Sequence, residues 1–146
     1  FEGEPWGITQ EMSERIGNKR EFDATIENMI KMRAAGIKVL PFGDYGFKMI
    51  PLGTDARDLQ HFVNYFGFAP WEALRAATAY GGQAYRVEKL GQVKPGYLAD
   101  LLLIDGDPLA NLQLFLDRDR FLMIMKDGQY HKPPQAPQSH RRAVAE

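Results

Sequence analysis

The segment from residue 34 to residue 44 constrains the fold more than any other part of the chain. Its sequence, Ala-Ala-Gly-Ile-Lys-Val-Leu-Pro-Phe-Gly-Asp, is typical of a helix end, a short buried strand, and a glycine and an aspartate at the strand's carboxyl end. Catalytic groups of α/β folds lie at such strand ends. A carboxylate held there can bind a metal and transfer a proton. Asp44 is therefore the first candidate for a functional residue.

Composition indicates a single globular domain and excludes several functions. The 146 residues suffice for one core, and 45% hydrophobic and 25% charged residues are ordinary for a soluble protein. A net charge of −1 gives no electrostatic basis for binding nucleic acid or an anionic membrane. The chain has no cysteine, which excludes disulfides and thiolate zinc sites and suits a cytoplasmic location. Because the chain starts at Phe1 rather than at a methionine, we expect a fragment, a processed product or part of something longer.

Apolar spacing predicts helices in the first part of the chain. The expected helices cover residues 9–16, 21–35, 56–66 and 70–80. Gly36 and Gly67 are suited to end two of them, and Thr54 or Asp55 to cap the third at its amino end. The small residues of the last helix predict close packing against a neighbour.

From Leu90 the pattern changes to strands separated by turns. The expected strands cover residues 90–93, 99–104 and 121–126, with a helical turn over 111–116. Turn formation accounts for four aspartates of this region. These are Asp100, Asp105, Asp107 and Asp127. Residues 132–146 carry prolines without an apolar pattern, which predicts a disordered tail.

Five sequence blocks occur in order along residues 34–131. They are AGIKV leading to Gly43 and Asp44, GFAPWEALRAAT at 67–78, LGQVKPGYLADL at 90–101, DGDPL at 105–109 and MKDG at 125–128. Together they resemble the C-terminal third of metal-dependent amidohydrolases of the imidazolonepropionase-like branch. The resemblance implies an α/β fold, the last βα portion of a (β/α)8 TIM-like barrel followed by the C-terminal strands of a small β-sandwich. Residues 1–88 would be the barrel portion, with strand 8 at about 37–43, and residues 89–131 the sandwich portion.

The resemblance also implies an activity. Such enzymes hold one or two divalent metals, usually zinc, and hydrolyse C–N bonds of small-molecule or dipeptide-like substrates. Of the metal ligands, only the aspartate after strand 8 would belong to this chain. Asp44 would then be both metal ligand and proton shuttle. The same scaffold also supports deaminase and phosphotriesterase chemistry, so the reaction class rests on analogy.

Two aspartates compete for this role. Asp55 ends a literal Gly-Thr-Asp, the common family tripeptide, whereas Asp44 follows Phe42 and Gly43. Only Asp44 directly follows an apolar strand, and its spacing of 28 residues to Glu72 fits the family better than the 17 residues from Asp55. We therefore assign Asp44, with Asp55 as the N-cap of the next helix.

Other polar and aromatic residues allow less specific interpretations. Tyr45 and Phe47 could line the substrate pocket or simply cover the barrel mouth. Arg57 and Asp58 fit a solvated helix start better than a substrate contact. The three histidines form no His-x-His or i, i+4 pair, which argues against a metal site built from them alone.

A second hypothesis holds that this chain alone is catalytically inert. One strand cannot close a barrel, and one ligand cannot hold zinc against water. The chain would then be a fragment or a subunit completed by another chain. Unpaired strand edges would make it adhesive, so we expect oligomers or a tightly bound partner that supplies the remainder of the barrel.

Overall fold

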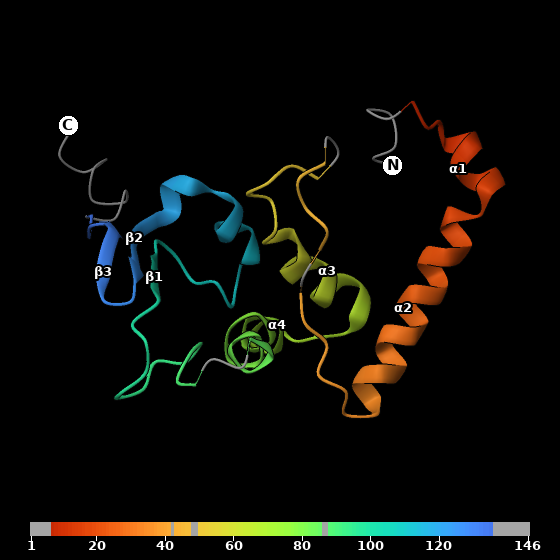
Figure 1. Cartoon of the computed structure of the whole chain (residues 1–146). Helices are drawn as coiled ribbons and strands as arrows, with labels where there is room; N and C mark the ends of the chain where they lie inside the picture. The colour runs from red at the N-terminus through yellow and green to blue at the C-terminus, as the bar shows by residue number, and fades with distance from the viewer. Residues whose placement is uncertain (1–6, 42, 48–49, 86–87, 136–146) are drawn as a thin grey trace.

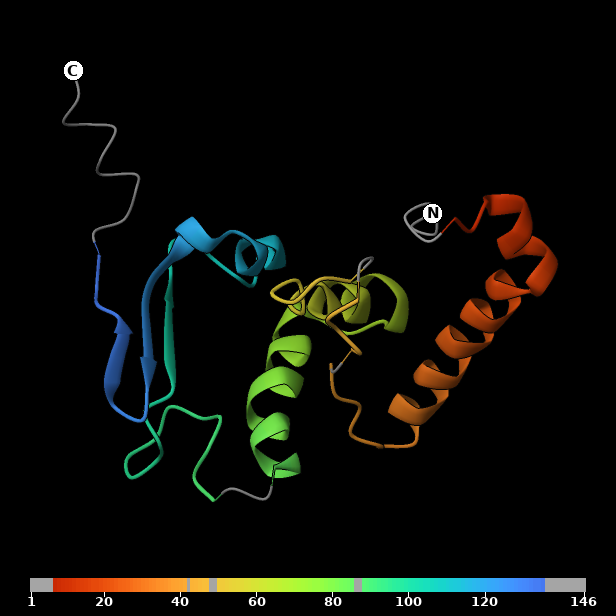
Figure 2. The same cartoon turned by 45° about the horizontal axis from the view of Figure 1, so that its top comes forward.

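The structure is a computed structural model that describes residues 7–41, 43–47, 50–85 and 88–135. Its elements lie in a row, with the helix pair α1 and α2 at one end, α3 and α4 in the middle and a small sheet at the other end (Figures 1 and 2). The described part of the chain has no helix that is both long enough and apolar enough to cross a membrane.

The first helix pair follows the expected positions. The helix α1 spans Gln10–Ile16, where Thr9 caps its amino end by accepting a hydrogen bond from the Met12 amide at 3.1 Å. Gly17, with φ +86°, ends α1 and leads into α2, Asn18–Ala34. The predicted helix 21–35 is thus confirmed. However, α2 has no fully buried residue: Met29 packs against the core, whereas Phe22, Ile30 and Met32 remain largely exposed.

The core lies between α3, Arg57–Phe66, and the helix that begins at Pro70. The second helix runs as α4, Pro70–Arg75, a π-helical stretch over Ala76–Tyr80, and α5, Gly81–Ala84. Ala73 and Ala76 are fully buried, which confirms the close packing expected from small side chains. Two residues from outside these helices also belong to the core: Val39, from the loop before α3, and Leu112, from the β region.

The sheet contains β1, Leu101–Ile104, β2, Phe121–Lys126, and β3, Gln129–Lys132, in the antiparallel order β1-β2-β3. The predicted strand over 121–126 is confirmed. Asp127 and Gly128 join β2 to β3 with φ of +48° and +75°, as a type I′ hairpin turn requires. Two short 3₁₀ helices, Leu112–Leu116 and Arg118–Arg120, connect β1 to β2, and Asn111 caps the first through the Gln113 amide.

Some expectations need correction. Residues 90–93 are not a strand: Gly91 has φ +76° and lies against the Thr78 carbonyl, so this segment turns around the preceding helix. The helix α3 begins after Ala56 without a side-chain cap, because the Asp55 carboxylate accepts instead from the Gly53 amide at 3.0 Å.

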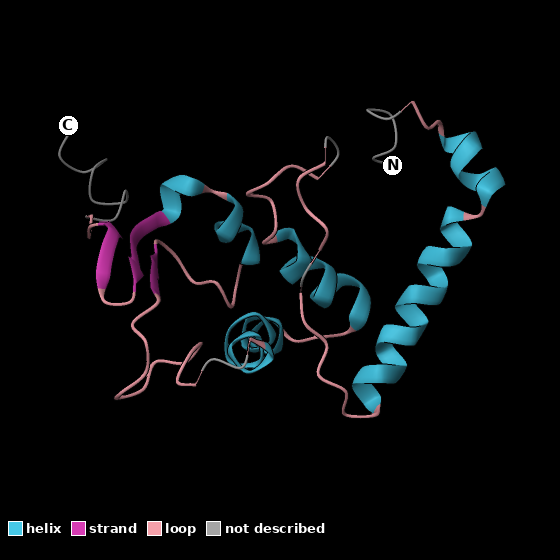
Figure 3. Ribbon diagram, viewed as in Figure 1, coloured by secondary structure: helices cyan, strands magenta, loops and turns pink. Residues whose placement is uncertain are grey.

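The described residues of the expected barrel strand at 37–43 form no sheet. Figure 3 draws the described residues between α2 and α3 as loop, and residues 37–41 form no ladder with the described chain. A β-strand needs a neighbouring strand to form its hydrogen-bond ladder, so this segment alone does not make one. Strand 8 therefore stays a prediction, and Phe42 and residues 136–146 of the predicted tail lie outside the described residues.

Candidate active site

Asp44 lies in the loop between α2 and α3, on the segment that the core holds in place. Val39 is buried in that core, and the backbone then leads outward to Gly43 and Asp44, which are both exposed. The core therefore fixes the start of the segment that carries Asp44 and leaves Asp44 itself open to solvent.

Tyr45 is held by a residue from α3. Its hydroxyl donates a hydrogen bond of 2.7 Å to Asp58 Oδ1, and the Asp58 side chain is only 16% exposed. Burial raises the pKa of Tyr45 far above its ordinary value, and the hydrogen bond to Asp58 and its negative charge raise it further. The phenol is therefore protonated, and remains a donor, across the physiological pH range.

Asp58 differs from the solvated helix start that its sequence position indicated. Besides the Tyr45 hydroxyl, its carboxylate faces His61, whose Nδ1 lies 3.7 Å from Oδ1. The His61 ring also packs near the Tyr65 ring, with centroids 5.8 Å apart. No sequence pattern pairs Tyr45 with a residue 13 positions later, so this contact was missed.

Gly43 gives the Tyr45 ring its space. A methyl group on Gly43 would overlap Tyr45 Cε2 and would lie 3.2 Å from Asp58 Oδ2. The ring thus packs directly over the backbone that precedes Asp44. A glycine at this position is a steric requirement of the Tyr45 placement rather than only a family signature.

The rest of the loop is closed by backbone hydrogen bonds. The Gly46 amide donates to the Ile50 carbonyl at 2.9 Å, and the Ile50 amide donates to the Phe47 carbonyl at 3.1 Å. Phe47 is about half exposed, at 47%, at the turn of this loop. Tyr45 and Phe47, the two predicted pocket residues, therefore flank the same short loop but differ in burial.

The described residues do not make a complete metal centre. Among them, no group of three or more His, Cys, Asp or Glu side chains is arranged to hold a metal ion. His61 faces Asp58 and His131 lies in β3, while His140 is outside the described residues. Asp44 can supply one oxygen ligand, and the donor set on this chain does not by itself fit zinc.

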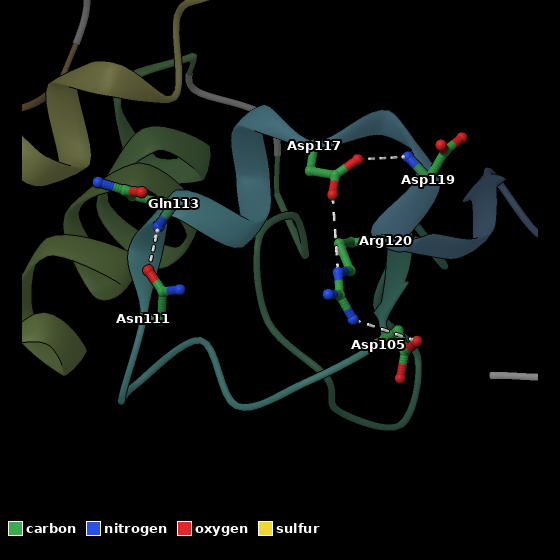
Figure 4. A network of polar contacts seen from close by, with 6 residues as sticks. All are labelled: Asp105, Asn111, Gln113, Asp117, Asp119 and Arg120. Atoms are coloured by element: carbon green, nitrogen blue, oxygen red, sulfur yellow. Dashed lines mark hydrogen bonds and ion pairs between the residues drawn. The ribbon is translucent and has the colours of Figure 1, made fainter. Parts of the chain in front are cut away.

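The aspartates of the β region have structural partners, as the sequence predicted. Arg120 lies between Asp105 and Asp117, with nitrogen–oxygen distances of 3.5 and 3.6 Å, and Asp117 also caps the Asp119 amide (Figure 4). Asp107 accepts from the Leu109 amide, and Asp100 accepts from the Asp127 amide at 2.7 Å. These contacts fix the turns around β1 and β2.

Comparison with known proteins identifies the family. The model of the amidohydrolase family matches residues 23–130. Ochratoxinase of Aspergillus niger is 29% identical over 119 residues, 78% of this chain and 24% of that protein. Imidazolonepropionase of Alteromonas mediterranea is 29% identical over 99 residues, 68% of this chain and 24% of that protein.

Solved structures agree with the sequence comparison. The crystal structure of the Aspergillus niger ochratoxinase has a TM-score of 0.75 at 25% identity, covering 87% of this chain and 28% of that one. A putative prolidase from Bifidobacterium longum has a TM-score of 0.77 at 25% identity, covering 97% and 34%. The chain thus spans about a quarter to a third of the length of these relatives. Sequence and structure lead to one conclusion: the chain belongs to the amidohydrolase family.

Proposed function

We propose that this chain is the C-terminal portion of a metal-dependent amidohydrolase that hydrolyses a C–N bond. Its substrate would be an amide or cyclic amide in a small-molecule or dipeptide-like compound. The observation that carries the proposal is the family match over residues 23–130, which includes Asp44 and the loop around it. The names of the relatives, an ochratoxinase, an imidazolonepropionase and a prolidase, support hydrolytic chemistry on small substrates.

In this proposal each loop residue has a role. Asp44 would contribute a carboxylate oxygen to the metal, and would take a proton from the attacking water and pass it to the leaving amine. Phe47, about half exposed in the same loop, would form one apolar wall of the substrate pocket. A divalent cation, one or two zinc ions in our proposal, supplies Lewis acidity at the site when bound. Its other ligands would come from outside this chain.

The same proposal assigns the parts of the fold. Residues 1–88 would be the last portion of a (β/α)8 barrel, with strand 8 at about 37–43, and residues 89–131 the sandwich portion. Support comes from the amidohydrolase structures that match most of the chain.

We also propose that the chain alone is inert and needs the remainder of the barrel. The observation in favour is the apolar surface that the described residues leave uncovered. Phe22 and Ile30 of α2 are 48% and 47% exposed, and Leu102 of β1 is 53% exposed. Exposed apolar side chains on several elements are typical of surfaces that bind further protein.

Native mass spectrometry of the purified protein tests the second proposal. We expect the 16.6 kDa chain to travel with a larger species, or as an oligomer, under non-denaturing conditions. A monodisperse 16.6 kDa monomer that binds no hydrophobic dye would contradict it.

A pair of aspartate variants tests the activity. In the active protein that contains this chain, Asp44→Asn should lower kcat against Xaa-Pro dipeptides or N-acyl amino acids by at least about 1,000-fold, since it removes an anionic ligand and the proton acceptor. Asp55→Asn is the matched control, because an asparagine oxygen can still accept from the Gly53 amide. Full activity of Asp44→Asn, or loss of activity in Asp55→Asn alone, would refute the assignment.

A further inference from the structure

We propose that Tyr45 and Asp58 act as a positioning pair that fixes the backbone on both sides of Asp44 and thereby aims its carboxylate. This inference rests on the proposed function, because the orientation of the Asp44 carboxylate matters only if Asp44 takes part in the reaction. It assigns Tyr45 a role different from a substrate contact, and it assigns Asp58 a role in place of a solvated helix start.

Tyr45 makes two contacts that restrain the loop at different points. Its ring lies against Gly43, so closely that a methyl group there would overlap Cε2. Its hydroxyl donates to Asp58 Oδ1 at 2.7 Å. Since Gly43 and Tyr45 are the two neighbours of Asp44 in the chain, one side chain fixes the backbone before and after the carboxylate.

Asp58 is a rigid anchor for this restraint. It lies in the first turn of α3, and the next residue, Leu59, is buried in the core together with Phe62. The hydrogen bond from Tyr45 therefore joins the loop around Asp44 to a helix that contributes two residues to the core. A hydrogen bond to a charged acceptor is stronger than one between neutral groups, so the carboxylate of Asp58 holds the Tyr45 hydroxyl more firmly than a neutral acceptor would.

The same geometry argues against a direct substrate role for the Tyr45 hydroxyl. Its single proton is already donated to Asp58. A substrate group would have to break this bond to gain a donor. Misplacement of a catalytic group by about 1 Å can cost on the order of 100-fold in rate, which is the scale available to a positioning pair.

Kinetics of the active protein that contains this chain test the pair. Tyr45→Phe and Asp58→Ala should each lower kcat by roughly 10- to 100-fold, with KM changed less than about twofold, because the carboxylate is misaimed while the pocket remains. The double variant should be no worse than either single one. Asp58→Asn keeps an oxygen that can accept the Tyr45 proton and should restore most of kcat. Tyr130→Phe, an exposed tyrosine in β3, is the matched control.

A raised KM with unchanged kcat in Tyr45→Phe would overturn the inference, because it would show a substrate contact. Additive losses in the double variant would overturn it as well. If Asp44→Asn keeps full activity, the proposed function fails. If Asp44→Asn is inactive while Tyr45→Phe and Asp58→Ala are unaffected, only the positioning pair fails.

Hydrogen exchange on the 146-residue chain gives a readout that does not depend on activity. The Gly46 amide, which donates to the Ile50 carbonyl, reports on the order of the loop after Asp44. We expect its exchange to accelerate at least about tenfold in Tyr45→Phe and Asp58→Ala, and to be unchanged in Asp58→Asn and Tyr130→Phe. Unchanged exchange in all four variants would show that the pair does not restrain the loop.

Discussion

Glu72 makes two polar contacts, one that caps its own helix α4 and one that joins α2 to it. Its Oε2 accepts from the Ala69 amide at 2.8 Å, at the amino end of α4, and from Arg33 Nη2 of α2 at 2.6 Å. The substitution Glu72→Ala removes both contacts without altering a buried apolar side chain. It therefore separates the contribution of these polar links from that of core packing.

The expected magnitude follows from the two contacts. Loss of a helix cap of this kind costs about 1 kcal/mol. The ion pair adds only about 0.5 kcal/mol, because the Arg33 and Glu72 side chains are 36% and 27% exposed. We expect a loss of about 1.5 kcal/mol, which for a chain of this size lowers Tm by about 3–6 °C. Glu72→Gln keeps an oxygen that can accept from the Ala69 amide, so it should lose only the contribution of the ion pair with Arg33.

The pH dependence gives a second check. The Ala69 amide, and then the Arg33 guanidinium, hold the pKa of the Glu72 carboxyl below its ordinary value. Since the pKa is lower in the folded chain than in the unfolded one, this stabilisation is complete above about pH 4.3 and is lost as the pH falls through the lowered value. Because glutamine does not titrate, Glu72→Gln should remove the loss of stability that protonation of the Glu72 carboxylate causes at low pH.

The assay is thermal unfolding followed by circular dichroism at pH 7 and at a series of pH values from 5 to about 2. Glu27→Ala is the control, because Glu27 is an exposed acid whose partner, Lys31, lies on the same helix. Equal midpoints for Glu72→Ala and the unsubstituted chain at pH 7 would refute the reasoning. So would an acid transition in Glu72→Gln identical to that of the unsubstituted chain.

Two further substitutions test the core and the turn that packs on it. Phe62→Ala removes a ring that is 3% exposed, and we expect a loss of about 3–5 kcal/mol with loss of the near-ultraviolet dichroism signal. An unfolding midpoint within error of the unsubstituted chain would show that Phe62 is not in the core. Gly91→Ala places a methyl group into the Thr78 carbonyl at a φ of +76°, and should cost at least about 1–3 kcal/mol in urea unfolding, whereas a neutral result would place this turn elsewhere.

Local patterns predicted most of the secondary structure. An apolar run bounded by turn signals located β2 at Phe121–Lys126, and apolar spacing located α3 within a residue of its observed start. Both signals are local: a helix face or a hairpin is encoded within a few neighbouring residues. The family resemblance, carried by blocks in a fixed order, was confirmed by the match over residues 23–130.

Properties that depend on distant partners were not predictable in the same way. The apolar face of α2 predicted burial, but burial needs a second surface, and the described chain covers this face only in part, at Met29. Ladder formation at 37–41 needs neighbouring strands for the same reason. In the candidate site, Asp44 followed from its position after a strand pattern. The link from Tyr45 to Asp58 depends on how the loop folds back onto α3.

The helix pair α1 and α2 also has a consequence for how the protein comes apart. The helix α2 has no fully buried residue; it is attached through Met29, which packs against the core, the Arg33–Glu72 ion pair and the edge-to-face contact of Phe22 with Tyr65. By contrast, α3 and the helix after Pro70 share the buried core. We therefore expect the N-terminal helices to open more readily than the central core, as a sub-global unit.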